Sequence, residues 1–325
     1  MQHDMQINLI DILKYKRQHG SATEAAFINH YLIPTINEIG YKPKMDMQGN
    51  VWVEVESKDK APYLFCAHID TCHRGEGMTT PVMDEQGVIS VHKDDIDGCC
   101  LGADDGVGIY CNLRLIEAGV AGTYLFTRGE ECGGIGAEYI AKETPDKLEG
   151  FLLCVEVDRA GTDEIIMSQS YGDCASVEFS SQLGHMLGMG HEPSQLGVYT
   201  DCAEFGDIIP ESVNISAGYD RQHTVKETVN TIYVENLVER LIGVDWSELV
   251  IVREPGDTGP DWWDTEPATI HEDYSSWKED RTMEDYVFYN PQTVAQFLVE
   301  IGVDVAEIEE TVGGSVSQYE DTARG

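Results

Sequence analysis

Apolar residues recur along the first 250 positions in two patterns, one typical of helices and one typical of strands. Between residues 6 and 40 they return every three or four positions, which predicts helices interrupted at Gly20-Ser21. Residues 51–55 alternate between apolar and polar, as in a strand with one buried face. Residues 63–67 are continuously apolar, which is typical of a strand buried on both faces.

The same two patterns continue to about residue 243. Further strands are predicted at 123–127, 151–157, 165–169 and 213–217, and further helices at 105–117, 136–142 and 229–242. Strands that alternate with helices predict an α/β fold, here a three-layer α/β/α sandwich with a mixed, mostly parallel central sheet. In such sheets functional residues collect just beyond the carboxyl ends of the strands.

The pattern changes at about residue 245. Residues 245–325 hold 20 Asp and Glu against 4 Lys and Arg, a net charge of 4 − 20 = −16. We therefore predict a catalytic domain over residues 1–244 and an acidic C-terminal extension over 245–325, with a linker at 253–260 and short helices within 291–310. The extension either packs partly on the first domain or forms a separate interaction module.

The charge of the whole chain excludes several classes of partner. The 325 residues carry a formal charge of −38, which argues against nucleic acid and against an anionic membrane surface. No apolar run approaches the roughly 18 residues of a membrane span. The acidity fits a strongly hydrated surface or an adaptation to high salt, and both interpretations stay open.

The nine cysteines point to a reducing compartment. Their number is odd, none has a Cys-x-x-Cys spacing, and Cys66 and Cys154 lie inside apolar runs, where cysteine acts as a small apolar residue. The first residues are polar and show no apolar signal segment. We therefore predict free thiols and a cytoplasmic protein.

Acidic and histidine residues form five short motifs along the chain, most of them just beyond a predicted strand or at the start of a predicted helix. The motifs are, in order, His68-Ile-Asp70, Asp104-Asp105, Glu130-Glu131, Asp158 and His223. Carboxylates and imidazoles in this mixture suit two neighbouring divalent metals, with one aspartate to bridge them and one glutamate as a base. Each motif alone fits an ordinary turn, helix cap or exposed loop. Together and in this order they predict a two-metal hydrolase, most simply a peptidase.

The spacing within the motifs suits this chemistry. His68 and Asp70 are two apart, so on an extended segment their side chains share a face. A metal-bound imidazole commonly donates its second N–H to a carboxylate. Adjacent Glu130 and Glu131 point in different directions, so one can bind a metal while the other faces the attacking water. Asp104 lies on a glycine-lined turn.

These motifs resemble those of the co-catalytic dinuclear zinc exopeptidases, the superfamily of bacterial aminopeptidases, peptidase T and glutamate carboxypeptidase. That group shows His-x-Asp, Asp-[Asp/Asn]-x-x-Gly, Glu-Glu-x-Gly, Asp and His. The matching residues here are His68-Ile-Asp70, Asp104-Asp105-Gly-Val-Gly108, Glu130-Glu131-Cys-Gly133, Asp158 and His223. Segments 46–50 and 200–205 also resemble the family, and the resemblance covers about residues 6–243.

The resemblance implies a dinuclear zinc metallopeptidase and a role for each residue. Carried over by position, one metal would be held by His68 and Asp158, a second by Glu131 and His223, with Asp104 as the bridge. Asp70 would orient His68, and Glu130 would be the general base. The cofactors would be two divalent ions, zinc by family, although this ligand type also accepts cobalt or manganese.

The implied activity is that of an exopeptidase, and specifically an aminopeptidase acting on a peptide or small amide. Two alternatives stay open: a deacylase of N-acyl amino acids, and an inactive peptidase scaffold that serves as a binding protein. Glu204 or Asp201 would be the acids that recognise a substrate amine.

The chain also departs from the family. Many relatives carry an inserted domain of about a hundred residues for lid formation or dimerisation, but the two gaps here, 68 to 104 and 158 to 223, span only 36 and 65 positions. Lid closure and large tetrahedral assemblies are therefore not predicted, and the sequence leaves the oligomeric state open. Cys72 and Cys132 flank site residues and would make activity sensitive to oxidation.

Overall fold

The computed structural model describes residues 7–56, 61–95, 100–169 and 172–257. Residues 253–257 of the predicted linker are described, whereas its last three residues and all of the predicted helices of the C-terminal extension lie outside the described residues. The chain divides into two units, Met1–Ile270 and His271–Gly325. The first unit, which contains every described residue, holds all five motifs.

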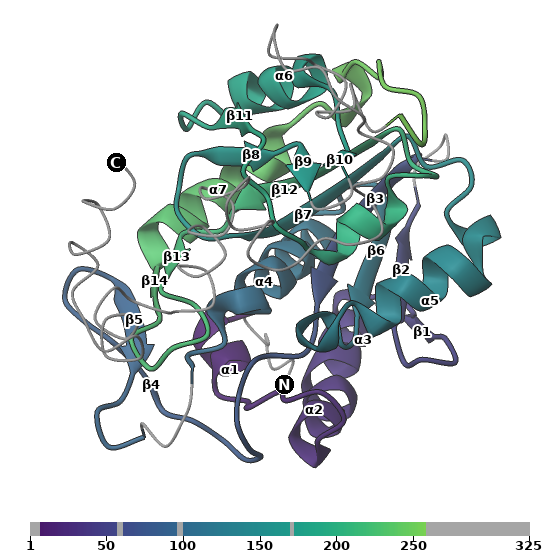
Figure 1. Cartoon of the computed structure of the whole chain (residues 1–325). Coiled ribbons are helices and arrows are strands. Elements are labelled where there is room, and N and C mark those ends of the chain that lie inside the picture. Colours follow the sequence, from purple (N-terminus) through teal and green to yellow (C-terminus); the bar gives the residue numbers. More distant parts are fainter. Residues whose placement is uncertain (1–6, 57–60, 96–99, 170–171, 258–325) are drawn as a thin grey trace, which may run out of the picture. The chain divides into compact units, whose positions relative to one another are not determined.

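A mixed sheet of eight strands forms the centre of this unit (Figure 1). Its spatial order is β1 (Lys44–Met45), β2 (Val51–Val55), β6 (Gly122–Thr127), β3 (Tyr63–His68), β7 (Leu153–Arg159), β12 (Glu211–Ser216), β8 (Glu164–Ile166) and β11 (Glu192–Ser194). The four central strands β6, β3, β7 and β12 are parallel to one another. β2 runs antiparallel to β6, and β8 antiparallel to β12. The mixed, mostly parallel sheet predicted from the sequence is confirmed.

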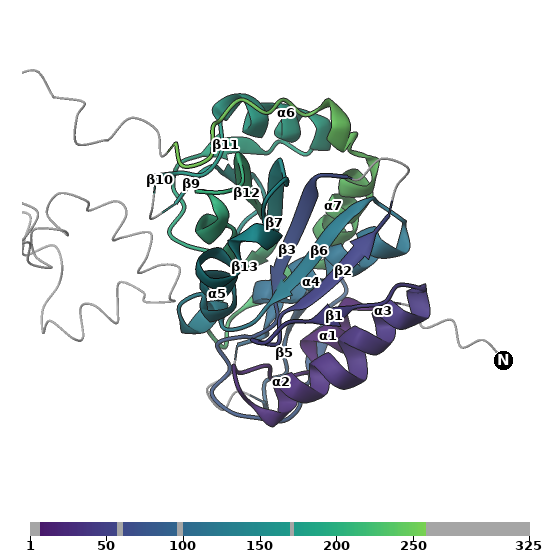
Figure 2. The ribbon, with the colours of Figure 1, turned by 90° about the vertical axis from the view of Figure 1, so that its right-hand side faces the viewer.

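Helices flank the sheet (Figure 2). They are α1 (Leu9–Leu13), α2 (Ala22–Phe27), α3 (Ile33–Ile39), α4 (Ala103–Glu117), α5 (Ile135–Glu143), α6 (Val177–Leu187) and α7 (Thr231–Gly243), with a π-helical turn, η1 (Ile28–Leu32), between α2 and α3. Shorter 3₁₀ turns are η2 (Glu130–Cys132), η3 (Pro145–Lys147), η4 (Asp201–Phe205) and η5 (Trp246–Glu248). The helices predicted at 105–117, 136–142 and 229–242 are therefore confirmed as α4, α5 and α7.

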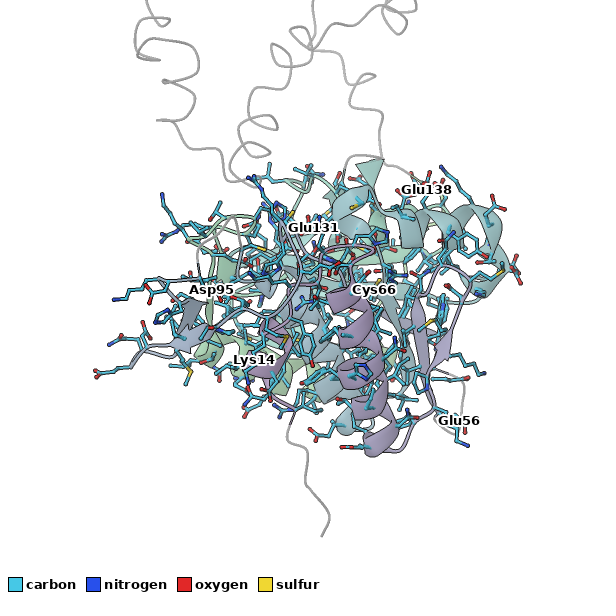
Figure 3. All side chains as sticks on the ribbon, turned by 90° about the horizontal axis from the view of Figure 1, so that it is seen from below. Lys14, Glu56, Cys66, Asp95, Glu131 and Glu138 are labelled. Atoms are coloured by element: carbon cyan, nitrogen blue, oxygen red, sulfur yellow. The ribbon has the colours of Figure 1, made fainter. Side chains whose placement is uncertain are left out.

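Two apolar cores lie on the two faces of the sheet. Because side chains alternate along a strand, Phe65 and Ala67 of β3 join the larger core with α1, α4 and α7, whereas Leu64 and Cys66 join the smaller one with α5. Both faces of β3 are thus buried, as its continuous apolar run predicts. Figure 3 shows Cys66 within the molecule and the exposed Glu56 at its edge.

A second, antiparallel sheet was not predicted. Its order is β13 (Tyr219–Asp220), β14 (Thr228–Asn230), β5 (Val88–Val91) and β4 (Pro81–Met83). The strand predicted at 165–169 is divided: β8 ends at Ile166, and β9 (Ser168–Gln169) pairs instead with β10 (Gly172–Asp173). Three of its four strands, β4, β5 and β13, come from the two gaps between motifs.

Residues 245–257, the first part of the predicted extension, pack on the larger core. Trp246 and Leu249 are buried, and the Trp246 ring stands edge-on to Phe65 with centroids 4.9 Å apart. The Arg253 guanidinium donates to the backbone carbonyls of residues 206, 209 and 210. None of the described helices is both long enough and apolar enough to cross a bilayer.

Candidate metal centre

The predicted site residues meet at one edge of the sheet. His68 ends β3, Asp158 is the second-last residue of β7, and Glu130 follows β6 after two residues. Since β3 is parallel to both β6 and β7, with His68 paired to Thr127, the three carboxyl ends lie side by side. Asp104 enters from the start of α4, and His223 follows β13.

His68 is the centre of a first group of ligand-type side chains. Its Nε2 lies 2.9 Å from Asp104 Oδ1, 3.7 Å from Asp158 Oδ1 and 4.0 Å from Glu130 Oε2. Its Nδ1 lies 3.1 Å from the backbone oxygen of Asp70, which can only accept, so Nδ1 carries the hydrogen in the neutral ring. Nε2 is then the nitrogen free to bind a metal.

His223 is the centre of a second group. Its Nε2 lies 2.9 Å from Asp104 Oδ2 and 3.2 Å from Glu131 Oε2. Asp104 therefore turns one carboxylate oxygen to each histidine, which is the arrangement a bridging carboxylate needs. Cys72 joins this group, because its Sγ lies 2.8 Å from Glu131 Oε2. Each group is compact, with its three ligand atoms within 4.8 Å of one another. The first group is His68, Asp104 and Asp158, and the second is Cys72, Glu131 and His223.

Asp70 holds the backbone of the glutamate pair. Its carboxylate accepts hydrogen bonds from the N–H groups of Gly129, Glu130 and Glu131 at 2.7, 3.1 and 3.2 Å. It also lies 3.8 Å from His68 Nδ1, so the carbonyl of Asp70 makes the closer contact with the imidazole. Asp70 is fully buried and links the end of β3 to the turn after β6.

Asp158 is held by side chains from two other segments. Thr200 Oγ1 donates to Asp158 Oδ2 at 2.8 Å, and the Tyr219 hydroxyl donates to Oδ1 at 2.9 Å. The Asn214 side chain accepts from the N–H of Asp158 and donates to its carbonyl. These contacts fix the carboxylate on the His68 side of the centre.

The turn that carries Asp104 rests on a buried carboxylate. Glu227 accepts hydrogen bonds from the N–H groups of Leu101, Gly102, Ala103 and Asp104, at 2.6 to 3.1 Å. These are N–H groups at the start of α4, where no helical carbonyl can accept them and where the helix dipole favours an anion.

Two further buried residues support the same turn. The guanidinium of Arg17 donates to the carbonyls of Ile12, Ile69 and Gly102. Asp105, joined to Asp104 by a cis peptide bond, accepts from the N–H of His68 at 3.0 Å. Arg17 and Glu227 were not predicted, because their partners are far away along the chain and no local pattern marks them.

Negative charge is concentrated in this buried volume. Burial and the neighbouring Asp104 raise the pKa of Asp158 to about 7. Burial raises the pKa of Glu130 well above its usual value, with Glu131 and Asp158 adding to the effect. Burial alone would lower the pKa of His223, but its hydrogen bonds, first of all to Asp104, outweigh burial and raise it. Such crowded carboxylates are stabilised by bound cations.

The donor set fits two divalent metals. Carboxylate oxygens and imidazole nitrogens are common ligands of zinc, cobalt and manganese. Glu131 Oε1 is buried and has no hydrogen-bond partner within the described part of the chain, so one ligand-type oxygen is left for another partner. The two groups meet at Asp104, as a shared bridging ligand requires.

Comparison with known proteins identifies the fold of the chain. Neither a protein-family model nor a curated protein matches the sequence. Among solved structures, the chain is similar to a tripeptidase from Staphylococcus aureus, with 15% identity and a TM-score of 0.59 over 72% of this chain and 95% of that one.

Two other solved structures support the same fold. The aminopeptidase PepT from Bacillus cereus matches with 14% identity and a TM-score of 0.57, over 72% of this chain and 95% of that one. An aminopeptidase from the archaeon Desulfurococcus kamchatkensis matches with 14% identity and a TM-score of 0.52, over 72% and 93%. At these identities the similarity establishes the fold.

The residues predicted to recognise a substrate amine have different surroundings. Asp201 is completely buried, whereas Glu204 is half-buried. Tyr199 lies among the same acids: burial raises its pKa, and Asp201, Glu204 and Glu130 raise it further. Acidic side chains therefore continue from Glu130 towards Glu204.

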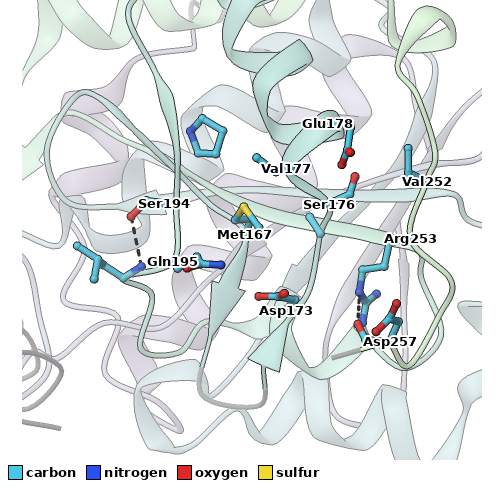
Figure 4. Close-up of a pocket in the computed structure, with 13 residues that line it drawn as sticks. Met167, Asp173, Ser176, Val177, Glu178, Ser194, Gln195, Val252, Arg253 and Asp257 are labelled. Atoms are coloured by element: carbon cyan, nitrogen blue, oxygen red, sulfur yellow. Dashed lines mark hydrogen bonds between the residues drawn. The ribbon is translucent and has the colours of Figure 1, made fainter. Parts of the chain in front are cut away.

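A separate hollow of about 840 Å³ lies beside the start of α6 (Figure 4). Its lining includes Met167, Asp173, Ser176, Glu178 and residues 193–196. It shares no residue with the two ligand groups. The hollow therefore provides no ligand to the centre.

Proposed function

We propose that the chain is a metal-dependent exopeptidase, and specifically an aminopeptidase. The observation that carries this proposal is the pair of ligand groups that meet at Asp104, with Glu130 beside them. In the proposed assignment His68 and Asp158 hold one metal, Glu131 and His223 hold the other, and Asp104 bridges them. Zinc is the proposed metal, and residues 1–244 are the proposed catalytic domain.

The residues divide the chemistry between them. Metals bound in these groups would supply an activated water and polarise the scissile carbonyl. Glu130 would accept a proton from the attacking water and deliver it to the leaving amine. Burial raises its pKa, which makes its carboxylate a stronger base. Asp70 is a positioning residue, because it fixes the N–H groups of the turn that carries both glutamates.

The charge around Glu130 favours release from the amino end of a peptide. The carboxylates of Glu204 and Glu130 both act on Tyr199, so negative charge extends from Glu130 towards Glu204. A free ammonium group is attracted by such a field, whereas the carboxylate of a peptide C-terminus is repelled. A peptide bound with its amine at Glu204 would place its first peptide bond towards Glu130.

The proposal is tested by measuring metal content and peptide hydrolysis on the same two proteins, the wild type and Glu130→Gln. We expect about two metals per chain in both proteins, and turnover of amino-acid amides and dipeptides only in the wild type, with a loss of about 10²–10⁴-fold or more in Glu130→Gln. Glu131→Gln is the matched comparison, because this neighbour should lose metal as well as activity.

Three outcomes would reject parts of the proposal. Hydrolysis of N-acyl amino acids but not of free-amine dipeptides would identify a deacylase instead. A wild type that binds metal yet cleaves neither substrate class would favour a binding protein on this scaffold. A wild type that binds no zinc, cobalt or manganese would reject the enzyme altogether.

A further inference from the structure

Cys72 occupies an unusual position among the cysteines of the described chain. It lies on the segment after β3, four residues beyond His68, and is half-buried. Cys66, Cys111 and Cys154 are enclosed in the apolar cores. The Sγ of Cys72 instead lies 2.8 Å from Glu131 Oε2 and forms one compact group with the ligand atoms of Glu131 and His223.

The surroundings of Cys72 indicate a ligand site rather than simple packing. The Glu131 side chain is only 8% exposed, and its Oε1 has no hydrogen-bond partner among the described residues. A buried carboxylate oxygen without a partner is costly unless a cation or a donor binds it. The thiol satisfies only the other oxygen. A metal between Cys72, Glu131 and His223 would engage all three groups at once.

We propose that Cys72 is a ligand of the second metal, together with Glu131, His223 and the bridging Asp104. This inference rests on the proposed two-metal function and adds a sulfur ligand to it. When the metal binds, the Sγ–H bond of Cys72 breaks, the electron pair stays on sulfur and the proton leaves to solvent, so no oxidant or reductant is needed. The second metal then has one sulfur, one nitrogen and two carboxylate ligands.

This ligand makes the two metal positions chemically different. The first group, His68, Asp104 and Asp158, offers only nitrogen and oxygen. Thiolate is a soft ligand that favours zinc over manganese or magnesium, which prefer oxygen. With four protein ligands the Cys72 position would be the more closed of the two, because catalytic zinc sites typically use three protein ligands and keep one position for water. We therefore expect the Cys72 position to select zinc, while the His68 position accepts a wider range of divalent metals.

Cobalt spectroscopy tests the inference without relying on activity. A thiolate bound to Co²⁺ gives a sulfur-to-metal charge-transfer band in the near ultraviolet, which carboxylate and imidazole ligands do not give. We expect this band in the cobalt-loaded wild type and its loss in Cys72→Ser. Cys132→Ser is the matched control, because Cys132 is exposed and neighbours Glu131 in the chain but belongs to neither ligand group. It should keep the band.

Zinc affinity provides a second measurement. In Cys72→Ser the zinc affinity of one of the two sites should fall by about 10–100-fold or more, since losing even an outer partner of a ligand typically costs that much. Zinc competition against manganese should show one zinc-selective site in the wild type and in Cys132→Ser, and none in Cys72→Ser. Circular dichroism of the metal-free proteins would show whether each variant folds.

The outcomes separate this inference from the proposed function. If the wild type binds two metals and Cys72→Ser shows the same cobalt spectrum and the same zinc affinities, the Cys72 inference is wrong and the two-metal centre stands. If the wild type binds no metal, both are wrong. If a band is present but is lost only in Cys132→Ser, the sulfur ligand has been assigned to the wrong residue.

Discussion

At the scale of single residues, Asp70 connects both ligand groups. Its Oδ1 accepts from Gly129 and Glu130, its Oδ2 accepts from Glu131, and its carbonyl contacts His68. In Asp70→Asn one oxygen becomes an NH₂ group. If that group replaces Oδ2, it faces the N–H of Glu131, so two donors meet and the Glu131 backbone must move.

We therefore expect Asp70→Asn to weaken the metal at Glu131 and His223 more than the metal at His68. The zinc affinity of one site should fall by about 10–100-fold, the loss usual for residues that support metal ligands. Zinc retained against a competing chelator would measure this. Asp163→Asn changes an exposed aspartate and should keep both affinities. Two unchanged sites in Asp70→Asn would show that the carboxylate does not position Glu131.

His73 makes a prediction about stability and pH. It is buried, and burial, with Arg17 and Lys16, lowers its pKa to about 3. Protonation therefore occurs first in the unfolded chain, where histidine has its ordinary pKa of about 6.5. The unfolded chain binds the extra proton, so this contribution to the free energy of unfolding is complete above pH 6.5 and is lost as the pH falls.

Between about pH 7.5 and pH 5, His73 alone should lower the free energy of unfolding by about 2 kcal/mol. Comparing urea unfolding of the wild type and His73→Gln over this range isolates it, because the other groups titrate in both proteins. His185→Gln removes an exposed histidine on α6 and should follow the wild type. If the free energy of unfolding changes with pH in the same way in the wild type and in His73→Gln, folded His73 does accept a proton.

At the scale of elements, the start of α4 depends on Glu227. Its two oxygens accept four N–H groups, and Gln in its place offers one oxygen and one NH₂ group. At least two buried N–H groups would then lack an acceptor, and leaving a buried donor without a partner costs roughly 1–3 kcal/mol each. Because α4 carries Asp104, the proposed bridging ligand, both metal affinities should fall together.

Thermal unfolding and zinc titration of Glu227→Gln check this prediction. We expect a lower Tm without metal and weaker binding at both sites, unlike the single-site effect expected for Asp70→Asn. Glu235→Gln on α7, which changes an exposed partner of Tyr110 and Arg114, is the control. A Glu227→Gln protein with wild-type Tm and metal affinities would show that the turn holds its shape without this carboxylate.

The elements that sequence could predict are those whose pattern is local. The buried strand at 63–67 and helices α4, α5 and α7 have strong apolar runs or helical spacing, and all four are present. Their alternation also placed the motifs at the carboxyl edge of the sheet. The short strands β4, β5 and β14 have only three or four residues, and β14 pairs with β5 across a distant segment, so no local pattern indicated them.

The supports of the site were not predictable for a similar reason. Glu227 contacts residues more than 120 positions away, and Arg17 reaches Gly102 across 85 positions. A single sequence shows such residues only as one charged side chain among many. Cys72 was predicted to be near the site because it follows Asp70, but only the fold brings it to Glu131 and His223.

At the scale of the whole molecule, the predicted boundary at residue 244 raises a question of stability. Trp246 and Leu249, just beyond it, are buried in the larger core. Glu211 accepts the backbone N–H groups of Val252 and Arg253. A chain that ends at residue 244 would expose the surface that these residues cover and would leave the carboxylate of Glu211 with fewer donors.

We expect a protein of residues 1–257 to bind metal as the full chain does, and a protein of residues 1–244 to be less stable by several kcal/mol. Removing a buried Trp side chain alone typically costs about 3–5 kcal/mol, so Trp246→Ala in the 1–257 protein should reproduce much of the loss. Urea unfolding and zinc stoichiometry of the three proteins measure it. If residues 1–244 unfold at the same urea concentration as 1–257, the boundary predicted from the change in composition is also the boundary of the folding unit. If the 1–244 protein unfolds at a lower urea concentration than the 1–257 protein, the folding unit extends to residue 257 and the acidic extension begins beyond it.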